Sequence, residues 1–310
     1  MLVIKKLFFI LLLFATSAWA SDRPIRLMLI WGGGIPETLT RLIQPILEQE
    51  LNRRVNLEFK PGAGGVIGIR YISQNHTDDV VISMIDTVSL ASIINTNPEI
   101  SIDDFSYIVQ MGTNKGVMLA VPKNSPLKNI ESWKSPRSIP LAVGINGMGS
   151  THHFYHWGFV NQTRTPTTEI FYKGSTDTLN NLLGGELDAM WGSVLQLEPY
   201  EKSGKLDVVA VTGRQRLDLF PNVPTFRELG IKMPAAGKWM ILSNNSADTE
   251  TLHQVELAFA NLTKQPNFTK LLAQAGLLVE ISTGNQAKQG TLEAIHQQSE
   301  FSEYVKNLKK

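Results

Sequence analysis

Short apolar runs alternate along the chain with stretches in which apolar residues recur every three or four positions. The first pattern is typical of β-strands and the second of amphipathic helices. Strands are predicted at 25–31, 55–59, 80–85, 116–121, 141–145, 169–172, 189–191, 208–212 and 239–242, and helices at 39–47, 66–73, 252–262 and from 286 to the end. This alternation predicts an α/β protein.

The first predicted helix shows the apolar spacing most clearly. Its apolar face is formed by Leu39, Leu42, Ile43, Ile46 and Leu47. Pro36 and Glu37 suit the first turn, where a missing N–H costs nothing and a negative charge faces the positive helix end. Pro45 lies inside the pattern, and we expect it to kink the helix or end it early.

A group of prolines divides the strands and helices into two sets. Pro122, Pro126, Pro136 and Pro140 follow the strand at 116–121, and a return strand is predicted at 239–242. A chain that leaves one domain, builds a second and returns indicates two hinged lobes. We expect lobe 1 to comprise 21–120 plus 237–310 and lobe 2 to comprise 121–236.

The N-terminus has the three parts of a cleavable signal peptide. Lys5 and Lys6 precede an apolar run at 7–15, and Ala18 and Ala20 stand where signal peptidase reads small residues. The run is too short to cross about 30 Å of hydrocarbon. We expect 1–20 to be a signal peptide and the protein to be periplasmic.

Composition excludes several functions. The 310 residues suggest about two domains at roughly 150 residues each. With 29 basic and 28 acidic residues, the chain has no field that would favour nucleic acid. The absence of cysteine excludes disulfides, thiolate metal sites, cysteine nucleophiles and a lipid anchor on cysteine.

Two strand-to-helix loops are candidates for binding an anion. Gly32, Gly33 and Gly34 precede the first helix, where free N–H groups favour an anion. A simple tight turn remains the alternative, and a dinucleotide site is excluded because Glu37 replaces the last glycine of its fingerprint. Ser150 and Thr151 begin a helix in the second lobe and can offer hydroxyls to the same carboxylated solute.

Catalytic and metal motifs are incomplete. His152 and His156 share a helix face, but His153 stands where a zincin helix needs glutamate, and no third ligand is evident. Ser150 lacks the flanking glycines of a nucleophile elbow. We therefore expect no enzyme activity, no metal and no cofactor.

The order of motifs resembles the periplasmic solute-binding proteins of tripartite tricarboxylate transporters, also called Bug proteins. The matching stretches are 33–34, 60–68 (KPGAGGVIG), 97–98, 104–105, 149–153 (GSTHH), 172–174 (YKG), 182–188 (LLGGELD), 203–206 (SGKL), 210–212 (AVT) and 221–225 (PNVPT). The resemblance covers nearly the whole chain after the signal peptide. It implies a type II periplasmic-binding-protein fold, the two-lobed Venus flytrap, that holds a carboxylate with backbone N–H groups and hydroxyls.

The resemblance also assigns site residues and shows departures. The implied substrate-binding residues are Gly33, Gly34, Ile35, Ser150, Thr151, His153, Trp191 and Gly192, with Lys173 and Gly174 bordering the cleft. The chain departs from the family at Pro36–Glu37, at Gly192, where an aspartate is common, and at Asn244, Asn245 and Ser246. We expect these positions to contact the solute and to determine which solute binds.

The departures suggest a preference among solutes. Pro36 cannot donate a hydrogen bond, Gly192 lacks a carboxylate, and Trp31 and Trp191 are expected to flank the cleft. We expect a solute with one carboxylate and an apolar or aromatic body. The alternative is that both tryptophans pack into the sheets.

The implied function is capture of a carboxylated solute and its delivery to the membrane subunits of a tripartite tricarboxylate transporter. The alternative is a ligand sensor that contacts the ectodomain of a two-component histidine kinase. We expect a monomer in either case.

We predict that export removes residues 1–20. N-terminal sequencing of the protein from a periplasmic extract should begin at Ser21. Recovery of the intact N-terminus in a membrane pellet would contradict this prediction.

Overall fold

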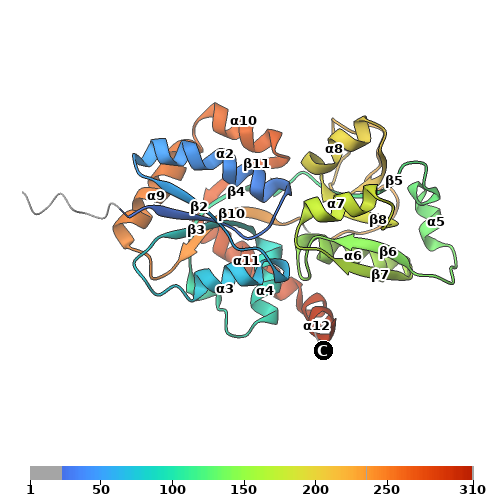
Figure 1. Cartoon of the computed structure of the whole chain (residues 1–310), viewed down its shortest axis with the longest axis horizontal. Coiled ribbons are helices and arrows are strands. Elements are labelled where there is room, and N and C mark those ends of the chain that lie inside the picture. Colours follow the sequence, from blue (N-terminus) through green and yellow to red (C-terminus); the bar gives the residue numbers. More distant parts are fainter. Residues whose placement is uncertain (1–22, 235, 309–310) are drawn as a thin grey trace, which may run out of the picture.

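The computed structural model describes residues 23–234 and 236–308, which form two α/β lobes (Figure 1). The predicted signal peptide at 1–20 lies outside these residues. The strands are β1 (Ile25–Leu29), β2 (Val55–Phe59), β3 (Val81–Asp86), β4 (Phe105–Asn114), β5 (Val117–Pro122), β6 (Leu141–Ile145), β7 (Thr167–Phe171), β8 (Ala189–Ser193), β9 (Leu206–Val211), β10 (Lys238–Asn244) and β11 (Leu277–Thr283). The two-lobed α/β prediction is confirmed.

The helices cover the faces of both sheets. They are α2 (Gly34–Leu51), α3 (Val66–Ser73), α4 (Thr87–Thr96), α5 (Ile130–Lys134), α6 (Thr151–Thr163), α7 (Ser175–Leu183), α8 (Val194–Lys202), α9 (Thr249–Leu262), α10 (Pro266–Gln274), α11 (Gly284–Gln297) and α12 (Ser299–Leu308). In the described part of the chain, no helix has the length and apolar character needed to span a bilayer.

The two sheets share one connectivity. The first has the order β11-β4-β10-β3-β1-β2 and the second the order β7-β6-β8-β5-β9. In each, a central strand pairs in parallel with two others: β1 with β2 and β3, and β6 with β7 and β8. Each sheet also contains one antiparallel strand that arrives from the other lobe, β10 in the first and β5 in the second. The chain therefore crosses between the lobes twice.

The crossings refine the predicted lobe boundaries. The chain leaves the first sheet after Asn114 and joins the second at Val117, so the boundary expected at 120 falls inside β5. The return boundary at 236 lies directly before β10, which begins at Lys238.

Several predicted elements differ from those observed. Helix α2 continues through Pro45 to Leu51, so the prediction of an early end is wrong. Pro45 lies on the exposed face, where water can satisfy the carbonyl that it leaves unpaired, while Ile43 and Leu47 stay buried. Strands β4 and β11 were not predicted, and the last predicted helix is two helices, α11 and α12.

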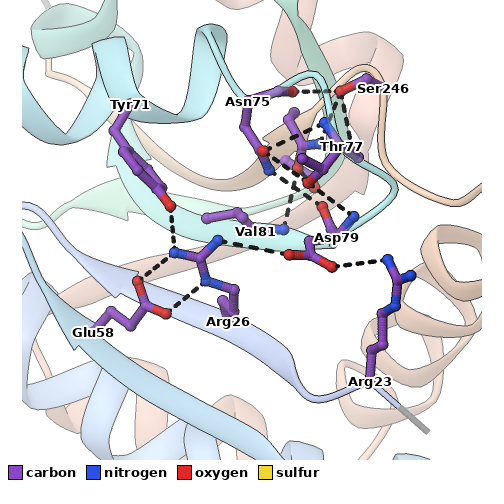
Figure 2. Close-up of polar contacts among 11 residues, drawn as sticks. Arg23, Arg26, Glu58, Tyr71, Asn75, Thr77, Asp79, Val81 and Ser246 are labelled. Carbon is purple, nitrogen blue, oxygen red and sulfur yellow. Dashed lines mark hydrogen bonds and ion pairs between the residues drawn. The ribbon is translucent and has the colours of Figure 1, made fainter. Parts of the chain in front are cut away.

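A network of polar contacts joins β1, β2, α3 and the loop before β3 in lobe 1 (Figure 2). Arg26 on β1 forms a bidentate ion pair with Glu58 on β2, with N–O distances of 2.6 and 2.8 Å. Asn244 accepts the N–H of Val81 at 3.1 Å, and Ser246 donates to the backbone of the loop before β3. Asn244 and Ser246 thus stabilise the start of β3, and Asn245 donates to the carbonyl of Asp103 at 2.7 Å. None of these three departures lines the cavity between the lobes.

Helix α12 forms a third connection between the lobes (Figure 1). Its Phe301 is fully buried and lies 5.0 Å, centroid to centroid, from Phe154 on α6. Val88 on α4 belongs to the same apolar cluster. The C-terminal helix therefore packs against helices of both lobes.

Two buried histidines attach α6 to the sheet of lobe 2. The indole N–H of Trp191 donates to Nδ1 of His156 at 3.2 Å, so the other ring nitrogen carries the proton and faces Thr167 at 3.1 Å. In His153, Nδ1 accepts the N–H of Gly149 and Nε2 faces Glu169 at 3.2 Å. These hydrogen bonds hold each ring in one orientation.

We predict that removing the Phe301 side chain destabilises the protein strongly. Phe301→Ala should cost about 3–5 kcal/mol of unfolding free energy, because it opens a cavity in the cluster that joins α4, α6 and α12. Phe59→Ala is the matched control, since Phe59 is 59% exposed and should cost little. Equal denaturation midpoints for the two variants would contradict this packing role.

We also predict that stability falls as the pH drops from about 6.5 to about 4. Burial lowers the pKa of His156 from 6.5 to about 4, so in this window the unfolded chain binds a proton that the folded chain does not. His156 alone should account for about 2 kcal/mol between pH 7 and pH 5. Urea unfolding at several pH values should show this slope, and His156→Gln should reduce it. An unchanged slope in that variant would exclude His156 as its source.

Candidate functional site

Five strand-to-helix junctions meet between the lobes. Lobe 1 contributes β1–α2 and β3–α4, and lobe 2 contributes β6–α6, β7–α7 and β8–α8. The carboxyl ends of parallel strands lie at one edge of a sheet, and these two edges face each other. They enclose a cavity of about 50 Å³ lined by residues of all five junctions.

Helix N-termini give this cavity its electrostatic character. The first N–H groups of a helix have no partner within the helix, and they carry the positive end of its dipole. The five helices therefore direct partial positive charge towards one small space. Such an arrangement can hold an anion.

Glycines allow the lobes to touch at the edge of the cavity. The N–H of Ser175 in lobe 2 donates to the carbonyl of Gly32 in lobe 1 at 3.1 Å. A Cβ at Gly174 would lie 2.2 Å from that carbonyl oxygen, and a Cβ at Gly33, where φ is 78°, would lie 2.5 Å from Thr176 Oγ1. Side chains at these positions would push the helix starts apart.

One wall of the cavity is aromatic. Trp31 and Trp239 pack edge to face with ring centroids 6.5 Å apart. Trp239 donates its indole N–H to Asn114 at 2.7 Å, whereas the buried indole N–H of Trp31 has no partner within the described residues. Trp31 thus gives the site apolar surface, and this indole N–H lies beside Gly65.

The opposite side carries a histidine and an asparagine. The amide nitrogen of Asn146 donates to Nδ1 of His152 at 3.1 Å and to Ser175 at 2.9 Å. The proton of neutral His152 therefore sits on Nε2. Burial lowers the pKa of His152 to about 4, which keeps it neutral at pH 7. Its Nε2 and the Asn146 Oδ1 are buried without a partner in the described part of the chain, one a donor and the other an acceptor.

The first-lobe loop lies in the cavity as expected, but one of its donors is occupied. Gly33, Gly34 and Ile35 all line the cavity. The N–H of Gly33 donates to Glu37 at 2.6 Å, and this bond lowers the pKa of Glu37. The first-turn N–H groups of Gly34 and Ile35 are then the donors that α2 can offer.

The second-lobe loop is also in place, with a different set of bonds. Ser150 and Thr151 line the cavity, and Ser150 caps α6 by accepting the N–H of His153 at 3.3 Å. The Thr151 hydroxyl donates to Asp86 of lobe 1 at 2.5 Å, and the Thr151 N–H donates to Ser89 at 3.3 Å. Thr151 thus joins the lobes directly.

Three of the expected site residues do not line the cavity. His153 is fully buried against Glu169 and α12, because one step along a helix turns a side chain by about 100°, and His152 faces the cavity instead. Trp191 is fully buried in the core of lobe 2. A Cβ at Gly192 would lie 2.8 Å from Leu197, so α8 covers this position. The alternative that both tryptophans pack into the sheets therefore holds for Trp191, whereas Trp31 lines the cavity.

The two residues expected at the cleft border, Lys173 and Gly174, line different spaces. Gly174 lines the cavity, whereas Lys173 lines a neighbouring space of about 410 Å³ between the lobes.

The sequence reasoning missed the β3–α4 junction and the capping residue of the β8–α8 junction. Asp86 caps α4 by accepting the N–H groups of Val88 and Ser89, and Ser193 caps α8 by accepting the N–H of Gln196. Both residues directly follow a buried apolar run. This pattern of a capping residue after a strand could have placed them at the cleft.

Comparisons with known proteins agree with this architecture. The family model of the tripartite tricarboxylate transporter family receptor matches residues 39–304. A protein from the gbd 5′ region of Cupriavidus necator is 27% identical over 262 residues, which cover 82% of this chain and 78% of that protein.

Solved structures share the fold. The periplasmic binding protein BugD superposes with a TM-score of 0.81 at 20% identity, over 92% of this chain and 98% of its own. MatC from Rhodopseudomonas palustris, solved with bound malate, gives a TM-score of 0.79 at 18% identity, over 90% and 99% of the two chains. The chain therefore belongs to the receptor family of tripartite tricarboxylate transporters, the periplasmic solute-binding Bug proteins, which are not enzymes.

Proposed function

We propose that this protein captures a small carboxylated solute between its lobes and delivers it to the membrane subunits of a tripartite tricarboxylate transporter. The convergence of five helix N-termini on one cavity carries this proposal. The cavity takes residues from both lobes, so a solute held there contacts both and favours their closed arrangement.

The donors around the cavity fit a carboxylate. Ile35 and Gly34 offer backbone N–H groups, and Trp31 and His152 offer buried side-chain N–H groups without protein partners in the described residues. Hydrogen bonds to an ionised group contribute about 1.5–3 kcal/mol each, and exclusion of water strengthens them. Malate in the structurally similar MatC is a carboxylate, which supports this solute class.

Delivery requires export and a membrane partner. The predicted signal peptide at 1–20 would place the protein in the periplasm, where receptors of this family act. The transporter's membrane subunits would then recognise the closed lobes. We expect a monomeric protein to suffice, because both halves of the cavity come from one chain.

The solute class can be tested on the purified protein. Mass spectrometry of the retained small molecule, followed by thermal-shift screening of carboxylic acids, should identify a ligand, because a compound that binds only the folded state raises the melting temperature. A retained solute without any acidic group would contradict the proposal.

We predict that Trp31→Phe weakens binding of that ligand about tenfold. The substitution keeps an aromatic wall and removes one donor to the carboxylate, at a cost of about 1.5 kcal/mol. Trp133→Phe is the matched control, because Trp133 donates to the Leu127 carbonyl within lobe 2 and lies outside the cavity. Calorimetric affinities that fall equally in both variants would show that the Trp31 donor does not act on the solute.

A further inference from the structure

Asp86 is a carboxylate built into the wall of the cavity. It stands at the end of β3, is 2% exposed and lines the space between the lobes. Its Oδ1 accepts the N–H groups of Val88 and Ser89, both at 3.0 Å, and the hydroxyl of Thr151 at 2.5 Å. Its Oδ2 accepts the Ser89 hydroxyl at 2.8 Å. Oδ2 thus keeps more capacity for another donor than Oδ1 does.

The charge of Asp86 has no cationic partner among the described residues. Every group that stabilises its carboxylate is a hydroxyl or a backbone N–H, and burial raises its pKa above the ordinary value. Neutral donors offset only part of the cost of burying a charge. A solute group that donates a hydrogen bond to Oδ2 would offset more of this cost.

A second acceptor belongs to a residue that lines the same cavity. Asn146 is 4% exposed, and its Oδ1 has no hydrogen-bond partner in the part of the chain that the structure describes. Asn146 comes from lobe 2 and Asp86 from lobe 1, so acceptors approach the solute from both sides. A carboxylate alone cannot satisfy them, because it has no hydrogen to donate.

We propose that Asp86 determines specificity by selecting a solute that carries a hydrogen-bond donor, an amino or hydroxyl group, beside its carboxylate. This inference rests on the proposed function and adds the second group that the solute must carry. A second carboxylate at the same place would face Asp86 as a like charge and is rejected.

The test uses four acids with the same three-carbon frame: propionate, lactate, alanine and malonate. Lactate and alanine carry a hydroxyl or an ammonium group in place of one α-hydrogen of propionate, and malonate carries a second carboxylate in place of its methyl group. Calorimetry on the wild-type protein should show lactate or alanine binding at least tenfold more tightly than propionate and malonate. Whichever of the two binds more tightly identifies the donor.

Two charge-matched variants assign the effect to Asp86. Asp86→Asn should reduce the preference for the donor-bearing acid over malonate at least tenfold. Asp177→Asn removes the same charge from the exposed first turn of α7 and should leave the order of affinities unchanged. Circular dichroism and the melting temperature check that both variants fold.

Different results overturn different claims. A wild-type preference for propionate or malonate overturns the role of Asp86 and leaves carboxylate capture standing, as does a wild-type order that survives in a folded Asp86→Asn. The wild-type order decides the matter even where that variant fails to fold. If none of the four acids binds and the solute retained on purification lacks a carboxylate, both claims fail.

Discussion

The structure depends on bringing the positive ends of five helices together in one small space. Helix N-termini carry partial positive charge and repel one another. The lobes can therefore close over a cavity of about 50 Å³ only if hydrogen-bond acceptors lie near these helix ends. The chain supplies two of these acceptors itself. Glu37 accepts from the start of α2, and Asp86 accepts from the starts of both α4 and α6. A solute carboxylate would add a further negative charge that accepts hydrogen bonds from these helix N-termini.

This constraint explains why close backbone contact and buried polar atoms occur together. The contact of Gly32 with Gly174 brings the helix starts near enough to share one ligand. At that distance little water fits, and the indole N–H of Trp31 and the carbonyl oxygen of Asn146 are left without protein partners in the described residues. Burying such groups costs free energy unless a ligand pairs with them. The closed lobes are therefore arranged for binding at some cost to their own stability.

The sequence could predict the parts of the site that depend on local rules. The glycines before α2 and the Ser150 cap of α6 follow from strand-to-helix chemistry, and both lie in the cavity. Which side chain faces the cavity depends on helix phase and strand register, so His153 was expected where His152 lies. The hydrogen bond between Asp86 and Thr151 joins residues that are 65 positions apart, and no local sequence pattern predicts it. Strand β4 was missed because polar residues and a glycine interrupt its apolar pattern, although it is buried between β10 and β11.

Packing of helix α12 links the geometry of the cavity to the opening and closing of the lobes. The chain crosses between the lobes after β4 and again before β10, and α12 packs on both α4 and α6. Phe301 contacts His153 and Phe154, which directly follow the cavity residues Thr151 and His152. Opening the cleft must either separate Phe301 from α6 or carry α12 away from α4 together with lobe 2. The free energy of that aromatic contact therefore enters the equilibrium between open and closed lobes, and through it the affinity for the solute.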